Sequence, residues 1–208
     1  MALLSPVVLE GLRVRLEPLD PAHLEGLFAA ASESRETYTL TTVPGSLEAL
    51  RAYIDFALAE TRAGRALAFA TVDRARGRVV GSTRFCNPEV WRWDRPPPAP
   101  LPDGPDAVEI GWTWLAASAQ RTGINREAKR LMFTHAFETG RVRRVTLKTD
   151  ARNQRSRQAM ERLGLHFDGV LRGHMPASDG GVRDSAYFSA LASEWPRMKA
   201  QLERPRSP

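Results

Sequence analysis

Cysteine is nearly absent from this chain, and so are long apolar runs. Cys86 is the only cysteine among 208 residues, which rules out a disulfide within the chain and the small disulfide-stapled secreted folds. No run of 18 apolar residues occurs, and residues 1–6 lack the basic region and apolar stretch of a secretion signal. We therefore expect a soluble, cytoplasmic protein without a membrane partner.

Lysine is also scarce, although the chain is strongly basic. Lys129, Lys148 and Lys199 are the only lysines, and arginine supplies the rest of a formal net charge of +6. The basic residues are spread along the chain and do not gather in one arm, so the charge does not favour a nucleic-acid partner. The histidines have no spacing that suggests metal coordination, and no metal is expected.

Strand-like and helix-like segments alternate along the sequence. Period-two alternation predicts an edge strand at 12–16 that stops at Pro18, and helical patterns predict helices at 21–31 and from Ser46 to about Gly64. Further strands are expected at 67–72, 79–85, 108–114, 144–150, 167–174 and 183–191, and further helices at 126–138, 153–164 and from Glu194. Hairpins near both ends favour an α/β (α+β) fold, a mixed sheet flanked by helices.

The length fits one domain, because no linker clearly divides the chain. We expect a single domain over residues 1–208 with a core at about 9–195, an insertion loop at 87–106 and a flexible tail at 204–208. The loop is rich in proline, which excludes regular helix or central strand there. It is interpreted either as part of the acceptor side of the site or as a plain surface loop, docked through Trp91 and Trp93.

Residues 107–138 carry the strongest functional signal. The strand 108–114 leads into Gln120-Arg121-Thr122-Gly123-Ile124-Asn125 and then into a helix. A loop that feeds a helix directs unpaired backbone N–H groups and the positive end of the helix dipole to one point, where phosphate oxygens bind well. Gly123 permits close approach of the backbone, and Arg121 and Arg126 add charge. This pattern predicts a site for a phosphorylated cofactor.

A second strand and helix, at 144–150 and 153–164, make the interpretation specific. Together the two segments resemble the GNAT superfamily of N-acetyltransferases, in particular the branch of ribosomal-protein N-terminal acetyltransferases. In that superfamily a Gln/Arg-x-x-Gly-x-Gly/Ala loop holds the pyrophosphate of acetyl-CoA, and an Asn-x-x-Ser/Ala helix closes the other side. Gln120, Gly123, Asn153 and Ser156 match this pattern. Asn125 stands where the family usually has Gly or Ala, and Asn is also a favoured helix N-cap.

The resemblance implies a single-domain GNAT-like fold with a mostly antiparallel, twisted sheet, and acetyl-CoA as co-substrate. It also implies an amine acceptor and a monomer or homodimer. Backbone N–H groups near Trp114 and Leu115, where strands of this family splay apart, would meet the oxyanion. The residues expected to bind acetyl-CoA are Trp114, Leu115, Gln120, Arg121, Thr122, Gly123, Ile124, Asn125, Arg126, Asn153 and Ser156.

Glu109 is the candidate catalytic base. Alternation predicts that Glu109, Gly111 and Thr113 share one face of the strand, opposite Val108, Ile110, Trp112 and Trp114. A carboxylate near the centre of a sheet is costly unless it has a partner or a task. The resembled branch has a glutamate there as the proposed base, acting directly or through water. The structural alternative is a buried ion pair with an arginine.

The general acid is less clear from the sequence. Many family members place a tyrosine acid on the second helix, where this chain has Met160. Ser156 is a catalytic candidate that would protonate the leaving thiolate, although we favour cofactor binding for it; alternatively it caps the helix. Tyr187 is a third candidate, but a strand tyrosine in a hairpin is more often a packing residue with a satisfied hydroxyl.

Three functions remain open at this point. The first is an acetyl-CoA-dependent N-acetyltransferase, an acyltransferase in which a primary amine of a protein N-terminus or small molecule attacks the thioester directly. The second is an acyl-CoA-binding module with little turnover, suggested by the departures at Asn125 and Met160. The third and weakest is a nucleic-acid-associated protein, suggested only by the charge.

Overall fold

The computed structural model describes residues 3–95 and 104–204, and eight strands in them form one sheet. The strand order is β1-β2-β3-β4-β5-β6-β8-β7, and only the β5–β6 pair is parallel. The expectation of a mixed, mostly antiparallel sheet flanked by helices is confirmed. The strands are β1 (Leu9–Glu10), β2 (Val14–Pro18), β3 (Ala66–Asp73), β4 (Arg78–Glu89), β5 (Ala107–Leu115), β6 (Arg144–Asp150), β7 (His166–Pro176) and β8 (Val182–Leu191).

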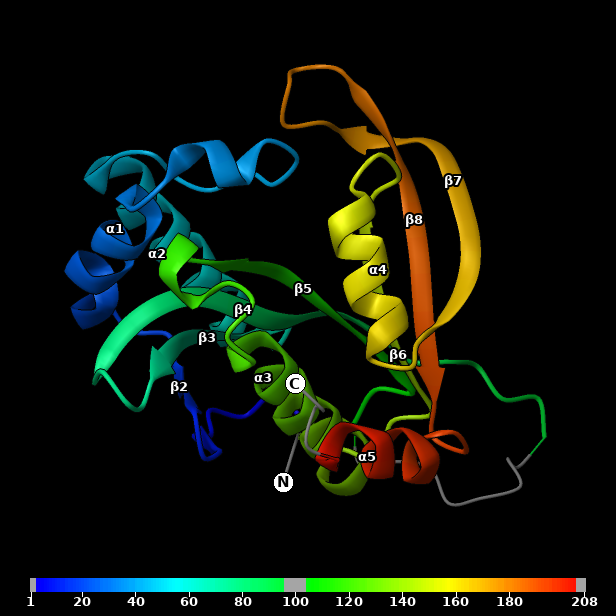
Figure 1. The fold of residues 1–208 in the computed structure, drawn as a ribbon. Coiled ribbons are helices and arrows are strands. Elements are labelled where there is room, and N and C mark those ends of the chain that lie inside the picture. Colours follow the sequence, from blue (N-terminus) through cyan, green and yellow to red (C-terminus); the bar gives the residue numbers. More distant parts are fainter. Residues whose placement is uncertain (1–2, 96–103, 205–208) are drawn as a thin grey trace.

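Helices cover both faces of the sheet (Figure 1). Tyr53 of α2 donates its hydroxyl hydrogen to Ser82 Oγ, whereas Lys129 of α3 donates to the hydroxyl of Thr83, the next residue of β4. Because neighbouring strand residues point to opposite faces, α2 and α3 lie on opposite sides of the sheet. The α-helices are α1 (Leu24–Ser32), α2 (Leu47–Arg62), α3 (Ile124–Thr134), α4 (Gln154–Arg162) and α5 (Trp195–Glu203). None of the helices within the described residues is both long and apolar enough to cross a bilayer.

Several expected boundaries move in the structure. Strand β2 is not the edge, because the two-residue strand β1 pairs outside it through Leu9↔Leu16. The helix expected at 21–31 starts as a 3₁₀ turn at Pro21–His23, with Asp20 as its side-chain cap, and becomes α1. The helix expected at 126–138 begins at Ile124 and ends in the π-helical turn His135–Thr139.

A β-bulge in β5 overturns part of the predicted face pattern. Trp112 has a φ of 53°, and the β4–β5 register shifts between Arg84↔Gly111 and Ser82↔Trp114. One extra residue on β5 changes which face the following side chains take. Glu109 and Gly111 share a face as expected, since a Cβ on Gly111 would lie 2.8 Å from Glu109 Oε1.

Beyond the bulge the prediction is wrong. Thr113 points to the α3 side, where its hydroxyl lies 2.6 Å from Lys129 Nζ. Trp112 instead lies on the α2 side, with its ring 6.0 Å from that of Tyr53. Trp114 lies across from Ser82 and contacts the ring of Tyr38. The alternation of residues in the sequence does not reveal this change of face, because a period-two prediction assumes an uninterrupted strand.

The two tryptophans at the start of the expected insertion loop contact each other, and Trp93 contacts the body through Arg143, whose guanidinium carbon lies 4.8 Å from its ring centre. Buried Asp106 accepts hydrogen bonds from the Trp91 backbone N–H at 2.9 Å and from Trp93 Nε1 at 3.3 Å. Its carboxylate also forms an ion pair with Arg143 at 3.1 Å. Strand β4 extends to Glu89, so the first residues of the expected loop are strand. The middle of the expected loop, at 96–103, and the expected flexible tail at 205–208 lie outside the described residues.

Candidate active site

The loop before α3 has the geometry of an anion site. Gly123 is the N-cap residue of α3, has a φ of 93° and offers no side chain as a cap. Within the described part of the chain, the backbone N–H groups of Thr122, Gly123, Asn125 and Arg126 have no hydrogen-bond partner. These free donors and the helix dipole favour a phosphate at this point. Asn125 is the second residue of the helix and not its cap, so its interpretation as an N-cap is wrong.

The charges around this loop differ from the expected ones. Arg126 directs its guanidinium to the end of α5, where it donates to the carbonyls of Gln201 at 2.8 Å and Arg204 at 3.2 Å. Arg13 lies beside the loop instead, with its Cδ 3.8 Å from the position of a Cβ on Gly123. Glu127 holds this segment against α3, since its carboxylate accepts N–H bonds from Leu12, Arg13 and Val14 at 3.0, 2.7 and 3.0 Å. Nothing local in the sequence predicts this contact, because more than a hundred residues separate Glu127 from its partners.

Gln120 joins the end of β5 to α4. Its side-chain amide donates to the Leu115 carbonyl at 3.0 Å and to Thr37 Oγ1 at 3.2 Å, and its oxygen accepts from Arg155 at 3.1 Å. The side chain is therefore occupied within the protein, and it brings the predicted phosphate loop next to the predicted second helix. Thr122 is similarly engaged, because its hydroxyl donates to the Ala119 carbonyl at 2.7 Å.

Strands β5 and β6 part at the centre of the sheet. Their pairing covers only Ala107↔Arg144, Val108↔Val145 and Glu109↔Thr146. In the part of the chain that the structure describes, residues 110–115 of β5 have no strand partner on that edge. Figure 1 shows β5 diverging from β6, with α4 standing in front of β6. The opening lies between the predicted phosphate loop and the start of α4, and the splayed segment includes Trp114 and Leu115.

The N-terminus of α4 faces this opening with a capped first turn. Asn153 is the N-cap residue, and its Oδ1 accepts the N–H of Ser156 at 3.0 Å. Asn153 and not Ser156 therefore caps the helix, so the capping alternative for Ser156 is wrong. The Ser156 hydroxyl is part-exposed and has no hydrogen-bond partner among the residues described. Met160, where a tyrosine acid was sought, is buried at 4% exposure.

Glu109 lies where the β5–β6 pairing stops. Its Oε2 accepts hydrogen bonds from Lys148 Nζ at 2.8 Å and from Asn87 Nδ2 at 2.9 Å. Burial works against the charge of Lys148, but the attraction of Glu109 and their hydrogen bond raise the pKa of Lys148 above its ordinary value. The partner of Glu109 is thus a lysine and not the arginine considered from the sequence. Lys148 could have been singled out as one of only three lysines, placed on a strand.

The other carboxylate oxygen of Glu109, Oε1, is not held by a hydrogen bond. Glu109 Oε1 has no hydrogen-bond partner within the described residues, and it occupies the space in which Gly111 lacks a Cβ. A side chain at 111 would collide with it at 2.8 Å. The local sequence Glu-Ile-Gly therefore leaves one carboxylate oxygen available while Lys148 and Asn87 fix the other.

Two neighbours of the Glu109–Lys148 pair are poor candidates for a chemical role. Cys86 is its cross-strand partner, and burial, followed by the charge of Glu109, raises the pKa of the thiol to about 12. Cys86 therefore stays protonated at neutral pH and is a poor nucleophile. Tyr187 lies under Lys148, and its hydroxyl is satisfied by His174 Nε2 at 3.2 Å. Burial, together with the charges of Lys148 and Arg183, lowers the pKa of His174.

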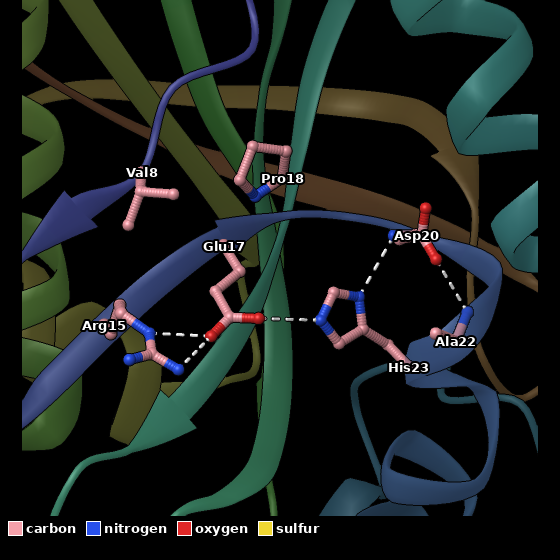
Figure 2. Close-up of a pocket in the computed structure, with 7 residues that line it drawn as sticks. All are labelled: Val8, Arg15, Glu17, Pro18, Asp20, Ala22 and His23. Carbon is pink, nitrogen blue, oxygen red and sulfur yellow. Dashed lines mark hydrogen bonds and ion pairs between the residues drawn. The ribbon is translucent and has the colours of Figure 1, made fainter.

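A pocket of about 310 Å³ opens beside Glu109 on the α2 side of the sheet. Cys86 and Asn87, the cross-strand and hydrogen-bond partners of Glu109, line it together with Arg84, Trp112 and Phe56, whereas Glu109 itself is not among its lining residues. A larger depression of about 570 Å³ lies near the β1 edge of the sheet, between β2 and the Pro21–His23 turn (Figure 2). There Glu17 accepts hydrogen bonds from Arg15 at 2.6 Å and from His23 at 3.0 Å, so the polar groups satisfy one another. None of the predicted site residues lines that depression.

Residues 3–95 and 104–204 contain no group of three or more His, Cys, Asp or Glu side chains placed to hold a metal ion. The groups gathered at the opening are backbone donors at α3, a hydroxyl at α4 and the Glu109–Lys148 pair. This combination suits an anionic ligand whose reactive end reaches a carboxylate.

Comparison with known proteins identifies the family. The profile of the "Acetyltransferase (GNAT) domain" matches residues 13–166, more than half of the chain. The protein named "Putative ribosomal N-acetyltransferase YdaF" from Bacillus subtilis (strain 168) is 34% identical over 88 residues, which cover 42% of this chain and only 47% of that relative. The match thus spans about half the length of this curated relative.

Solved structures agree over nearly the whole chain. A GCN5-related N-acetyltransferase from Brucella melitensis superposes with a TM-score of 0.78 at 32% identity, covering 96% of this chain and 85% of that one. A "putative acetyltransferase" from T. thermophilus superposes with a TM-score of 0.77 at 35% identity, covering 96% of each chain. The resemblance inferred from the two loop-and-helix segments is confirmed, and the chain belongs to the GNAT family of acetyltransferases.

Proposed function

We propose that this protein transfers the acetyl group of acetyl-CoA to a primary amine by direct attack, with Glu109 as the base. The amine belongs to a protein N-terminus or to a small molecule. The observation that carries the proposal is the position of Glu109, whose free Oε1 lies where β5 and β6 separate. The name of the relative YdaF makes ribosomal proteins the first acceptors to test.

The residues present suit acetyl-CoA. The free N–H groups around Gly123, with Arg13 and exposed Arg121 nearby, would hold the pyrophosphate. Ser156 and the open edge of β5 at Trp114 and Leu115 would line the path of the thiol-bearing arm. When bound, acetyl-CoA supplies an activated thioester. The protein's own task is to place the acceptor nitrogen and to remove its proton.

Glu109 is equipped for that task. A primary amine is mostly protonated at neutral pH, so its attack needs a group that accepts a proton. Lys148 and Asn87 hold Oε2 and orient the carboxylate, and Oε1 remains for the amine or for a bridging water. The protonated thiol of Cys86 favours direct attack over a route through an acetylated cysteine.

A binding module with little turnover remains the second candidate. It is favoured by Met160, which leaves no acid on α4 at the position where relatives of the resembled type often carry tyrosine. A thiol is a tolerable leaving group without an acid, so this difference does not abolish the reaction.

Thiol release from acetyl-CoA, measured with a panel of amines and N-terminal peptides, tests the proposal. Release that depends on an amine and yields the acetylated product supports transfer. Tight binding of acetyl-CoA without release for any acceptor would favour the binding module instead.

A further inference from the structure

Arg84 is a buried cation that the acetyl-transfer site does not use. It lies in β4 at 1% exposure, and its Nε and Nη2 atoms are buried without a hydrogen-bond partner among the described residues. No carboxylate in the part of the chain that the structure describes forms an ion pair with it. A buried charge of this kind is costly unless a partner or a ligand compensates it.

Aromatic rings hold the guanidinium in place. Its central carbon lies 4.3 Å from the ring centre of Trp112, 4.8 Å from that of Tyr53 and 5.8 Å from that of Phe56. Such stacking stabilises the cation through the ring faces but leaves its in-plane N–H donors unpaired. Trp112 and Phe56 remain about half exposed, at 49% and 48%. The cation is thus oriented by its surroundings, with donors still to be satisfied.

The same residues form the pocket beside the proposed base. Arg84, Trp112 and Phe56 line the 310 Å³ pocket together with Asn87, which binds Glu109. Arg84 pairs with Gly111, two residues from Glu109 on the same face, so the two backbone positions are about 7–8 Å apart as diagonal neighbours. The other pocket arginine, Arg65, is already paired with Glu60 at 2.6 Å. Glu60 also attracts Arg84 through space, but its carboxylate is held by Arg65, so two arginines and one glutamate leave the pocket with one positive charge in excess.

We propose that Arg84 binds a carboxylate of the acceptor, so that the preferred substrates are amines with an acidic group several bonds from the nitrogen. A guanidinium matches a carboxylate through two parallel N–H bonds. A backbone separation of this order between positions 84 and 109 fits a peptide N-terminus with an acidic side chain at the first or second residue, or a small amino acid with a distant carboxylate. The inference rests on the proposed function, because it assigns the acceptor of that same site.

Matched acceptors that differ only in charge test the proposal. The peptide amides Ala-Glu-Ala-Ala and Ala-Gln-Ala-Ala, and 4-aminobutyrate with its amide, are compared by kcat/KM for the unaltered protein. We expect at least about a 10-fold preference for the acidic member of one pair, expressed mainly in KM, because hydrogen bonds to charged groups are the stronger class. The pair that shows the preference tells whether the carboxylate comes from a peptide or from a small molecule.

Variants then assign the preference to Arg84. Arg84→Met should abolish it while acetyl-CoA affinity is unchanged, and Arg84→Lys should retain part of it. Arg65→Met is the matched control, since its cation lines the same pocket but is paired with Glu60, and it should leave the preference intact.

The outcomes separate this inference from the proposed function. Equal acetylation of acidic and neutral acceptors by the unaltered protein would overturn the inference and leave acetyl transfer standing. If no amine is acetylated, the proposed function fails, and calorimetric titration of the acidic peptide into the CoA-saturated protein decides the inference. Binding that is lost in Arg84→Met would support it, and absent or unchanged binding would overturn it. The comparison of acceptors with the unaltered protein remains decisive even if Arg84→Met does not fold.

Discussion

Replacement of Glu109 by glutamine is the most informative perturbation of the proposed site. The amide has nearly the same shape as the carboxylate, so its oxygen still accepts the hydrogen bonds from Lys148 and Asn87 that now end on Oε2. The change removes the proton acceptor at Oε1 and the negative charge beside Lys148. Folding and acetyl-CoA binding should therefore be unchanged, whereas position 109 no longer accepts the proton of the amine.

The size of the effect follows from general-base catalysis. A positioned base contributes about 10²–10⁴-fold to the rate, or about 3–5 kcal/mol in the barrier. We expect Glu109→Gln to lower kcat by at least about 100-fold with the affinity for acetyl-CoA unchanged. The variant should also recover rate as the pH rises, because deprotonation of the amine in solution then replaces the missing base.

The assay is continuous detection of free CoA thiol with a saturating acceptor between pH 6 and 9. Glu89→Gln is the control, since Glu89 lies on the neighbouring strand, accepts only an exposed bond from Trp91 Nε1 at 3.1 Å and has no role in the proposed chemistry. A loss below about 10-fold in Glu109→Gln, or a loss equal to that of the control, would refute the assignment of Glu109 as base.

Three further predictions concern the supports of the site. Glu127→Ala should lower the free energy of unfolding by about 2–3 kcal/mol, because three N–H groups lose a charged acceptor, and a change below about 0.5 kcal/mol in urea unfolding would contradict this. Burial lowers the pKa of Lys129 to about 7, so between pH 7 and 10 the unfolded state binds the proton that the folded state has lost. The free energy of unfolding of the unaltered protein should therefore rise across this window relative to that of Lys129→Met. A difference between the two proteins that stays constant with pH in urea unfolding would show that Lys129 keeps its ordinary pKa. Arg13→Ala should weaken acetyl-CoA binding several-fold in calorimetry and Arg126→Ala should not, because the Arg13 side chain lies beside Gly123 whereas the Arg126 guanidinium is bound to the end of α5. The opposite ranking would reverse our assignment.

Local sequence patterns predicted the elements well where the chain follows one periodicity. The strand expected at 144–150 has these same limits as β6, because its alternation is uninterrupted. The strands expected at 67–72 and 79–85 are joined by a turn at Gly77, and the helix expected from Ser46 is capped by that serine, since glycine turns and serine caps leave local signals. The turn at Gly123 before α3 belongs to the same class, because a glycine before a helix is a local feature, whereas its binding of phosphate stays a prediction.

Features that depend on distant contacts could not be predicted. The bulge at Trp112 moves that ring to the α2 side, and nothing in the alternating sequence marks the extra residue. The pairing of Glu109 with Lys148 follows from the parallel register of β5 and β6, and the approach of Arg13 to Gly123 follows from contacts of Glu127. Arg84 did leave a signal, as the one charged residue within 79–85, which is otherwise apolar, small or hydroxyl-bearing.

Binding of acetyl-CoA at the start of α3 is measured by calorimetric titration of the unaltered protein and of the variants Gly123→Trp and Gly77→Trp. Both glycines have positive φ, of 93° and 62°, so both replacements strain the backbone, but only Gly123 lies at the start of α3. We expect one acetyl-CoA to bind per chain to the unaltered protein and to Gly77→Trp, and we expect Gly123→Trp to lose binding. No binding by the unaltered protein, or equal binding by both variants, would contradict this expectation.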